Sequence, residues 1–468
     1  MNIVYQLTEE EYNNLLKVKQ EPDTMLRETN KSLKQKLDAL EKASKNTVSV
    51  SQSISTELTQ RSGILEKSQQ SNSLGMGIEL LVNNKFSSHS ASDLRLDSLG
   101  PFLRRAIDAT AFLEEDPHRS LGDFTQMGSA AIDLDVFDQR YNNRSPEDRK
   151  KQLSELEETC HSTSADSNVR SITTHVWDSY VQSHVFALDK ARTTQQFSAG
   201  WERTSFGMGA EITLVGDDGR LPEAYDFRSA RHLSDLPTTT VIANSLLKGA
   251  KSRLKSSALP SAKMPLLIEN KKASKILSAL LGPMAGSAIY EQRSCLLNKL
   301  NTKIASSALS IYDDPHVPRG LASRPYDSDG YPTQRRVLVE DGMLRQYRIN
   351  LYNSRRLECD KTTGSTSNIC IAPSALSPQE IINDLPQCIV VEGFLGGNTN
   401  PITGDFSWGI TGRYFEHGEF VQGVSEMNIS GNILELLERF ELAANDVWKY
   451  GSAMVPSLLF SNVQFSGV

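Results

Sequence analysis

The spacing of apolar residues changes along the chain and marks out its expected elements. From Val48 to Leu58 apolar side chains recur at even intervals of two or four residues, which is typical of a strand. An apolar run over 76–82 ends in the turn signal Asn83-Asn84, which predicts an antiparallel meander. Residues 99–113 instead place apolar side chains on one helical face. This N-terminal region is therefore expected to be an α/β domain.

The second half of the chain is expected to be rich in strands. Short apolar runs separated by turn residues predict hairpins over 336–349 and 414–421. The weakly alternating tail, 458–465, is expected to close a sheet. Further strands are predicted at 64–67, 171–177, 181–188, 211–215, 264–268 and 311–314, and further helices at 146–160, 233–254, 273–281 and 433–443. The pattern predicts an α+β fold: an N-terminal α/β domain with an antiparallel meander and helices, and a C-terminal β-rich domain.

The length of 468 residues is too great for a single core and indicates two or three domains. We place an N-terminal helical extension at 1–47, the α/β domain at 48–235 and the β-rich domain at 236–468. A stripe of leucines from Leu26 to Leu40 predicts a helix in the extension. That helix either binds a partner or packs on its own sheet, and the shortness of the stripe favours the second reading.

Composition narrows the classes of function. Charged residues make up 23% of the chain and the net charge is −7, so a nucleic-acid partner is not expected. No apolar stretch approaches the roughly 20 residues of a membrane span, and no signal peptide is visible. The five cysteines are widely spaced and form no CxxC pair, which favours free thiols in a reducing compartment. A cytoplasmic location is therefore predicted.

The stretch 393–432 is unusually rich in glycine and predicts a β platform. Gly396-Gly397-Asn398 and Thr403-Gly404-Asp405 lack side-chain bulk where another backbone could approach. In the segment Phe406-Ser407-Trp408 the two aromatic rings alternate with a serine, so they share one strand face. Phe406 is expected in the core, and the alternative is that this face forms a wall of a peptide channel.

Other candidate chemistry has a simpler structural explanation. Asp313-Asp314-Pro315-His316 combines possible metal ligands, but a turn capped by aspartates is the favoured reading. The turn 327–330 resembles part of a calcium loop, yet Leu338 stands where the loop needs a glutamate. Cys359 lies between Glu358 and Asp360, which disfavours its thiolate. The sequence contains no G-x-S-x-G elbow.

Seven segments, in order along the chain, carry a family resemblance. They are LGMGIELLVNNKFSSHSASDL (74–94), EEDPHRSLGD (114–123), YDFRSARHLSDL (225–236), LLGPMAGSAIYEQRSCLLNKL (280–300), SIYDDPHVPRGLASRPYDSDG (310–330), VEDGMLRQYRINLYNSRRL (339–357) and GGNTNPITGDFSWGITGRYFEHGE (396–419). The chain resembles the TldD/PmbA family, also called modulators of DNA gyrase, and within it the TldE (PmbA) branch. The resemblance spans 48–468.

The resemblance implies a TldD/TldE heterodimer that acts as a zinc metallopeptidase on unfolded or modified peptides. In the family, zinc is held by the TldD-type chain through an HExxxH helix and a cysteine near the C-terminus. Aligned on that helix, this chain has Gly282 and Pro283 in place of His-Glu and Ser287 in place of the second His. Its last cysteine is Cys388. We therefore expect no metal and no catalytic residue in this chain, with zinc in a TldD-type partner.

The leading hypothesis is a non-catalytic subunit that completes the substrate channel and supports the zinc-bearing partner. Arg355 is included as a candidate contact to a peptide carboxylate or to the partner. The predicted substrate- or partner-binding residues are Gly396, Gly397, Asn398, Thr403, Gly404, Asp405, Phe406, Ser407 and Arg355. Two alternatives remain: a homodimeric, non-catalytic peptide-binding protein, and a metal-independent hydrolase that uses Ser or Cys.

Overall fold

The computed structural model describes residues 45–467 except 124, 129–130 and 190–195. The fold separates into two compact units. The first comprises the described parts of 1–53, 72–127 and 182–201, and the second those of 54–71, 128–181 and 202–468. The predicted boundaries at 47 and 235 do not coincide with these units and stay predictions. The leucine-striped helix predicted at Leu26 to Leu40 lies outside the described residues.

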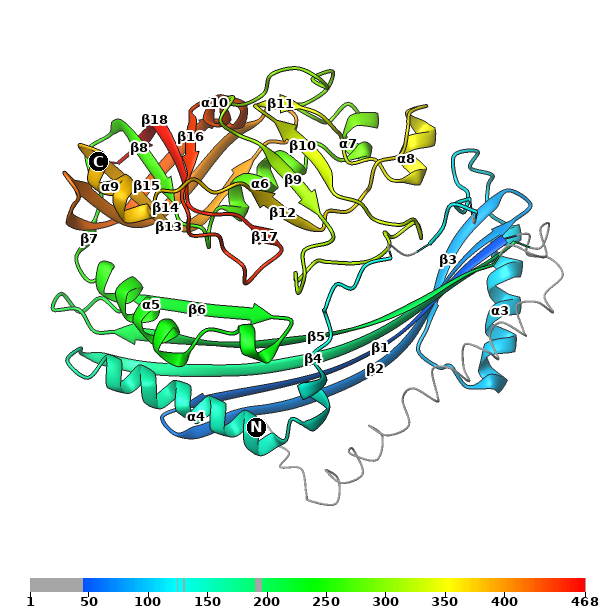
Figure 1. The fold of residues 1–468 in the computed structure, drawn as a ribbon, viewed down its shortest axis with the longest axis horizontal. Helices are drawn as coiled ribbons and strands as arrows, with labels where there is room; N and C mark the ends of the chain where they lie inside the picture. Colours follow the sequence, from blue (N-terminus) through cyan, green and yellow to red (C-terminus); the bar gives the residue numbers. More distant parts are fainter. Residues whose placement is uncertain (1–44, 124, 129–130, 190–195, 468) are drawn as a thin grey trace. The chain divides into compact units, whose positions relative to one another are not determined.

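The N-terminal part of the chain forms a six-stranded sheet with the strand order β3-β2-β1-β4-β5-β6 (Figure 1). Its strands are β1 (Lys45–Arg61), β2 (Ile64–Val82), β3 (Lys85–Ala91), β4 (Val169–Asp189), β5 (Gln196–Leu214) and β6 (Glu223–Ala230). The pairs β2–β3 and β5–β6 are antiparallel. Asn83 and Asn84 form the turn between β2 and β3 with φ of 51° and 60°, which confirms the predicted meander.

In the first unit, α3 (Leu96–Ala111) packs on the sheet. Leu99, Leu103 and Ile107 lie one helical turn apart and are buried, as the apolar period of the sequence predicts. They pack against strand residues that are also buried: Val48, Val50, Met76, Ile78, Leu80 and Val82. The alternate positions of the strands thus supply one side of this core.

In the second unit, α4 (Pro146–Thr163) and α5 (Thr239–Ser252) pack on β4, β5 and β6. Ser145 and Asp148 form a capping box at the start of α4, directly before Pro146 at the first helical position. Leu153 and Leu156 of α4, with Ile242 and Leu246 of α5, share one core with the strands.

The C-terminal part of the second unit holds two sheets (Figure 1). The seven-stranded sheet has the order β16-β18-β8-β13-β14-β15-β7, and a further β18–β15 pairing makes it barrel-like. Its strands are β7 (Ser256–Ser257), β8 (Ala262–Ile268), β13 (Gln387–Thr399), β14 (Asp405–Glu416), β15 (Glu419–Asn432), β16 (Phe440–Ala443) and β18 (Leu458–Ser466). The predicted closing tail is therefore confirmed.

The second of these sheets has five strands in the order β11-β10-β9-β12-β17. Its strands are β9 (Ile311–Asp314), β10 (Arg336–Glu340), β11 (Met343–Leu344), β12 (Asn368–Ile371) and β17 (Ala453–Met454). The accompanying helices are α6 (Ser274–Leu281), α7 (Gly286–Tyr290), α8 (Leu351–Arg356), α9 (Pro378–Asp384) and α10 (Ile433–Glu438). One apolar core joins both sheets, with Trp408, Phe460 and Phe465 among its fully buried side chains.

Several predicted elements differ from the observed ones, and three cases are instructive. The strands expected at 64–67 and 76–82 are one strand, β2, and those at 171–177 and 181–188 are one strand, β4. The helix expected over 433–443 ends at Glu438, because Phe440 to Ala443 pair with β18. In each case pairing with a neighbouring strand overrides the local pattern. Among the described helices, none has the length and hydropathy needed to cross a membrane.

Candidate functional site

The glycine-rich stretch forms the meander of β13, β14 and β15. His417 and Gly418, with φ of 48° and 83°, make the turn between β14 and β15, as the hairpin signal predicts. Beyond its pairing with β8 at Ile389–Val391, β13 continues to Thr399 beside β14 alone within the described chain. Residues 394–399 therefore present a strand edge that the described residues leave open.

The glycines of this stretch have different surroundings. Gly397 has a φ of 86° and sits in a bulge of β13, and a Cβ on it would collide with the carbonyl oxygen of Ser407. The close approach expected at Gly397 is thus made by the chain's own β14. Gly396, with φ of 65°, has no atom within 4 Å of a Cβ position and faces open space.

The remaining predicted residues of the meander divide into a turn and a buried face. Asp405 accepts hydrogen bonds from Thr403 Oγ1 at 2.7 Å and Asn432 Nδ2 at 3.0 Å, and these bonds lower its pKa. Gly404, with φ of 84°, lies in the same turn. Phe406 is buried and stacks on Trp408 with ring centroids 4.1 Å apart, so its core reading is confirmed.

The structure brings only some of the predicted residues together. Asn398 and Ser407 are exposed partners across β13 and β14. Arg355 lies exposed on α8, and no contact found in the described chain joins it to the other predicted residues. Substrate or partner binding by this set stays a prediction.

The segment 280–287, which the sequence analysis aligned with a zinc-binding helix, does not form one continuous helix. α6 ends at Leu281, Gly282 and Pro283 follow it, and α7 begins at Gly286. Neither imidazole nor carboxylate is present at 282, 283 or 287, so these residues do not fit a zinc ion. Over the described part of the chain, no group of three or more His, Cys, Asp or Glu side chains is arranged to hold a metal.

The other candidate groups have the simple roles favoured from sequence. Asp314 accepts a hydrogen bond from the backbone N–H of His316 at 2.9 Å, and Asp327 accepts from the N–H groups of Asp329 and Tyr331. All five cysteines are free. Burial raises the pKa of all five thiols, to about 12 for Cys160, which favours the unreactive thiol form.

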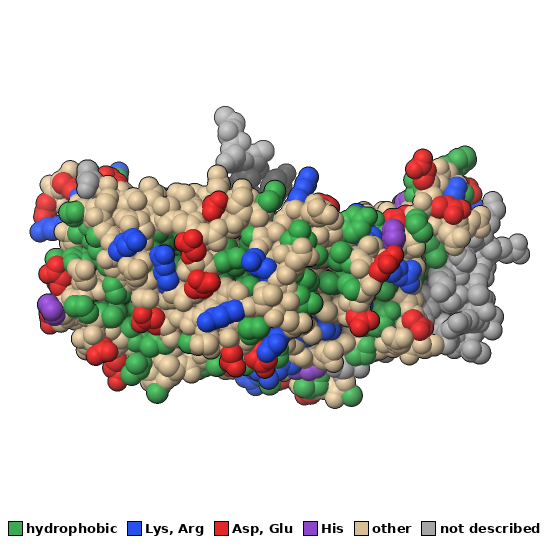
Figure 2. Space-filling view, turned by 90° about the horizontal axis from the view of Figure 1, so that it is seen from above, with side chains coloured by type: hydrophobic (Ala, Val, Ile, Leu, Met, Phe, Trp, Pro, Cys, Tyr) green, Lys and Arg blue, Asp and Glu red, His purple; other side chains and the backbone are tan. Residues whose placement is uncertain are grey.

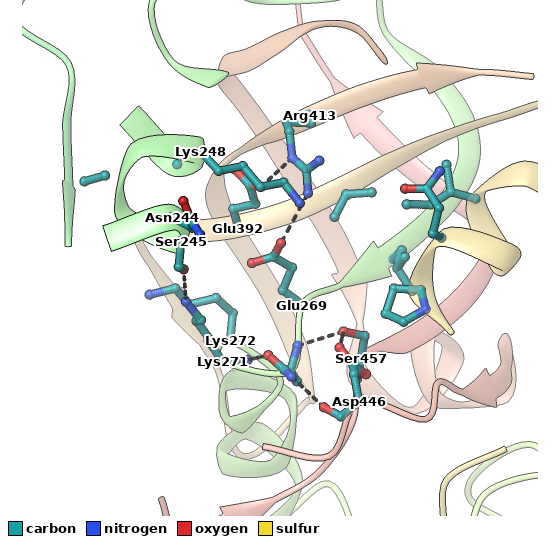
Figure 3. A pocket seen from close by; sticks show the side chains of 18 of the residues that line it. Asn244, Ser245, Lys248, Glu269, Lys271, Lys272, Glu392, Arg413, Asp446 and Ser457 are labelled. Atoms are coloured by element: carbon teal, nitrogen blue, oxygen red, sulfur yellow. Dashed lines mark hydrogen bonds and ion pairs between the residues drawn. The ribbon is translucent and has the colours of Figure 1, made fainter. Parts of the chain in front are cut away.

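A cavity of about 500 Å³ lies within the second unit, among α5, β6, β8, β13, β14 and α9 (Figure 3). Its charged lining residues are Arg228, Lys248, Arg253, Glu269, Lys271, Lys272, Glu392, Arg413 and Asp446. Glu269 directly follows β8, while Glu392 and Arg413 project from the paired strands β13 and β14. The pairing of β8, β13 and β14 thus brings together charges that lie far apart in the sequence.

Arg413 links the two glutamates of this cavity. Its Nε donates to Glu392 and its Nη2 lies 3.3 Å from Glu269 Oε1. Ser252 Oγ donates a second bond to Glu392 at 3.2 Å. Burial, followed by the charge of Glu392, raises the pKa of Glu269 to about 7, although 28% of its side-chain surface still meets the cavity.

The cationic side chains at the edge of the cavity differ in whether they have hydrogen-bond or ion-pair partners within the protein. Lys271 Nζ donates to Asp226 at 2.8 Å and to Ser245 Oγ at 2.7 Å, and Arg228 also pairs with Asp226. Lys248 has no hydrogen-bond or ion-pair partner among the described residues. Burial and then Arg413 lower the pKa of Lys248.

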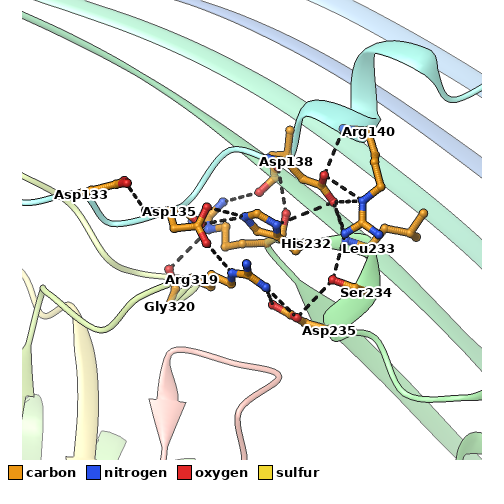
Figure 4. Close-up of polar contacts among 12 residues, drawn as sticks. Asp133, Asp135, Asp138, Arg140, His232, Leu233, Ser234, Asp235, Arg319 and Gly320 are labelled. Carbon is orange, nitrogen blue, oxygen red and sulfur yellow. Dashed lines mark hydrogen bonds and ion pairs between the residues drawn. The ribbon is translucent and has the colours of Figure 1, made fainter.

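A separate polar cluster joins three segments of the second unit (Figure 4). His232 Nε2 donates to the backbone oxygen of Asp135 at 2.9 Å, and Arg319 bridges Asp135 and Asp235. Asp138 accepts from the N–H of Leu233 at 2.9 Å. These groups bind one another, so the cluster fixes the ends of loops rather than offering open donors to a ligand.

The fold is that of an α+β protein, with a long antiparallel sheet in the N-terminal part and a barrel-like sheet in the C-terminal part. The charged cavity lies beside this C-terminal sheet. The model of the PmbA/TldA metallopeptidase C-terminal domain matches residues 261–467, and that of domain 1 matches residues 47–110. Together these two models cover more than half of the chain. The chain belongs to the PmbA/TldD metallopeptidase family.

Known proteins of similar length agree with this assignment. The chain is 26% identical to Metalloprotease PmbA of Escherichia coli O157:H7, over 90% of this chain and 92% of that protein. A solved structure from Bacteroides thetaiotaomicron, described as a candidate modulator of DNA gyrase, has a TM-score of 0.85 and 27% identity and covers 99% of this chain and 100% of its own. TldE from Thermococcus kodakarensis has a TM-score of 0.82 at 18% identity, covers 95% of this chain and 99% of its own, and shares the fold.

The cavity residues were missed by sequence reasoning. Glu392 ends the apolar run Cys388 to Val391, and Arg413 stands inside a strand whose neighbours alternate between buried and open positions. A charge within such a strand is a signal for a buried ion pair or a site. The sequence did not show that these two side chains and Glu269 would meet.

Proposed function

We propose that this chain is a TldE/PmbA-like, non-catalytic subunit of a cytoplasmic TldD/TldE-type zinc metallopeptidase. The complex would act on unfolded or modified peptides, with zinc in the TldD-type partner. The observation that carries this proposal is the break between α6 and α7 at Gly282 and Pro283, in a chain that otherwise follows the family. Without imidazoles on one continuous helix, the motif cannot form here.

The open edge of β13 supports a role in holding an extended peptide. Residues 394–399 are paired with β14 on one side, and within the described chain no strand lies on the other. An extended peptide can add to such an edge through main-chain hydrogen bonds, with specificity from neighbouring side chains. Asn398 and Ser407, which are exposed at this end of the meander, would lie near that peptide.

Co-expression with a TldD-type chain that carries HExxxH tests the proposal. We expect a heterodimer that contains zinc and cleaves an unfolded protein such as reduced, carboxymethylated lactalbumin, while the isolated chain does neither. A partner in which the glutamate of HExxxH is replaced by glutamine should assemble but lose cleavage. Stoichiometric zinc together with EDTA-sensitive cleavage by the isolated chain would falsify the proposal. A stable homodimer that binds peptides and ignores the partner would favour the non-catalytic peptide-binding alternative.

A further inference from the structure

The charged cavity beside the C-terminal sheet holds more positive than negative groups. Six cationic side chains are among the described residues that line it: Arg228, Lys248, Arg253, Lys271, Lys272 and Arg413. Three carboxylates line it as well, and a fourth, that of Asp226, pairs with two of the six cations. With every group ionised, the described residues therefore leave an excess of two positive charges in and around the cavity.

Two of the carboxylates that line the cavity already accept hydrogen bonds from within the protein. Glu392 accepts from Arg413 and from Ser252 Oγ. Asp446 accepts from the backbone N–H of Ser457 at 2.8 Å and from its Oγ at 2.7 Å. A ligand cation in this space would therefore add to the excess of positive charge rather than offset it.

The remaining carboxylate, that of Glu269, is only partly ionised near neutral pH, because burial and then the charge of Glu392 raise its pKa to about 7. The positive charges that act on it are those of Arg413, Lys271 and Lys248. Lys248 is exposed, so the cavity opens to solvent at this lysine. Glu269 and Glu392 act on Lys248 in turn and offset part of its charge. The positive excess therefore rests mainly on other side chains.

Arg253 and Lys272 line the cavity and have no carboxylate partner among the described residues. Arg253 Nη1 donates to the backbone oxygen of Glu223, whereas its Nε is buried and has no hydrogen-bond partner in the described chain. Lys272 Nζ donates to the hydroxyl of Tyr225 at 3.2 Å and lies 4.8 Å from the centroid of that ring. A lysine ammonium has three donors, so this bond leaves others unused. Buried donors are normally paired, and an acceptor is missing here.

The cavity offers little apolar surface to a ligand. Leu267, Ile382 and Val390 belong to its lining but are only 1%, 4% and 1% exposed. The accessible lining is thus mainly polar and cationic (Figure 3). The volume of about 500 Å³ falls in the range of small-molecule sites. These features favour a compact polar ligand with negative charge.

We propose that this cavity binds a small, multiply charged oxyanion, whose oxygens accept hydrogen bonds from Arg253 and Lys272. The oxyanion supplies the acceptor that Arg253 Nε lacks and offsets the positive excess of the cavity. Phosphoryl and carboxylate oxygens share this chemistry, since both accept charge-assisted bonds from guanidinium and ammonium groups. The inference does not depend on the proposed subunit role, because it rests on the charges of the cavity alone.

Calorimetric titration of the full, isolated chain with sodium sulfate and with sodium tartrate, at constant ionic strength, tests this site. Sulfate presents oxygens in the geometry of a phosphoryl group, and tartrate presents two carboxylates. We expect at least one of them to bind, and Arg253→Met and Lys272→Met each to weaken that binding about 10-fold or more. The matched control Lys251→Met removes an exposed positive charge of α5 outside the cavity and should bind as the wild type does.

The pH dependence of binding provides a second readout. Both probes stay doubly charged from about pH 6 to about pH 8, whereas Glu269, with its pKa of about 7, loses its proton over this range. Binding should therefore be tighter at the lower pH, by about 3-fold or more, because a neutral Glu269 does not repel the anion. Glu269→Gln should bind equally at both pH values. A dependence that persists in this variant would contradict an anion held beside Glu269.

The remaining outcomes are equally decisive. Binding of sulfate alone identifies a phosphoryl-type site, and binding of tartrate alone identifies a carboxylate site. Absence of binding of both probes at millimolar concentration, an equal loss in Lys251→Met, or equal competition by chloride would each overturn the inference. Unchanged melting temperatures show that a loss of binding arises at the site. If Arg253→Met fails to fold, Lys272→Met keeps the test decisive, since the Lys272 side chain contacts only Tyr225 in the described chain.

Discussion

Gly396 and Gly397 are neighbours in β13, yet only the second is held against another strand. Gly397→Ala combines a positive φ with a collision against the Ser407 carbonyl, and we expect a loss of more than about 3 kcal/mol of unfolding free energy. Gly396→Ala meets no atom and should cost only about 1 kcal/mol, from its positive φ. Urea unfolding of both variants measures the difference. Equal losses would show that the bulge is not packed against β14 as described.

The surroundings of Glu269 raise the pKa of its carboxyl group, so its charge near neutral pH differs from that of an ordinary glutamate. Its folded-state pKa of about 7 lies above the ordinary value of 4.5, so the native state binds more protons between these limits. Stability contributed by this group is therefore present at low pH and is lost as pH rises through about 7. Above that pH, the charged glutamate should cost the native state on the order of 1–3 kcal/mol.

The variant Glu269→Gln removes this titration. We expect Gln to be neutral or slightly destabilising near pH 5 and stabilising near pH 8, relative to wild type. Urea unfolding at several pH values gives both curves. Exposed Glu419→Gln serves as the control and should leave the curve unchanged. Parallel stability curves for wild type and Glu269→Gln would contradict the raised pKa.

At the scale of elements, a buried ion cluster attaches α4 to β4. Asp178 of β4 is fully buried and lies 2.6 Å from Arg149 Nε and 3.3 Å from Arg144 Nε. Asp178→Ala would leave two buried guanidinium groups uncompensated, and we expect a loss of about 3–5 kcal/mol in unfolding free energy.

The exposed pair Lys151–Glu155 of the same helix provides the control for that measurement. Glu155→Ala should cost no more than about 0.5 kcal/mol, since exposed pairs contribute little. Thermal and urea unfolding compare the two variants. A loss below about 1 kcal/mol for Asp178→Ala would show that the cluster does not hold α4 in place.

Local periodicity predicted the elements that keep one apolar face. The alternation in β14 placed Phe406 and Trp408 on the same side, and both are buried. It failed where pairing decides the structure: β2 runs through the polar residues near 68–73, and β16 replaces the end of the helix expected at 433–443. Strand pairing depends on partners distant in sequence, which a local pattern does not contain.

At the scale of the whole molecule, the family and the α+β fold could be predicted, whereas the charged cavity could not. Ordered motifs extend over most of the chain, so their sum identifies a fold even when each is weak. The cavity instead depends on Lys248, Glu269, Glu392 and Arg413, which come from four separate elements. These side chains lie close together because β8, β13 and β14 are neighbours in one sheet. The local sequence pattern does not contain that strand order.

The net charge of the whole chain bears on the description of its structural relatives as modulators of DNA gyrase. With a net charge of −7, the chain should be repelled by the phosphate backbone rather than gain affinity from counterion release. We expect no shift of a short DNA duplex at protein concentrations up to about 10⁻⁶ M in physiological salt. Gel-shift titration over a range of salt concentrations makes the measurement, with a basic DNA-binding protein as positive control. A shift whose affinity falls steeply with salt would reveal a cationic surface and contradict the expectation. Absence of a shift at every salt concentration would show that this chain does not bind duplex DNA directly, as its net charge predicts.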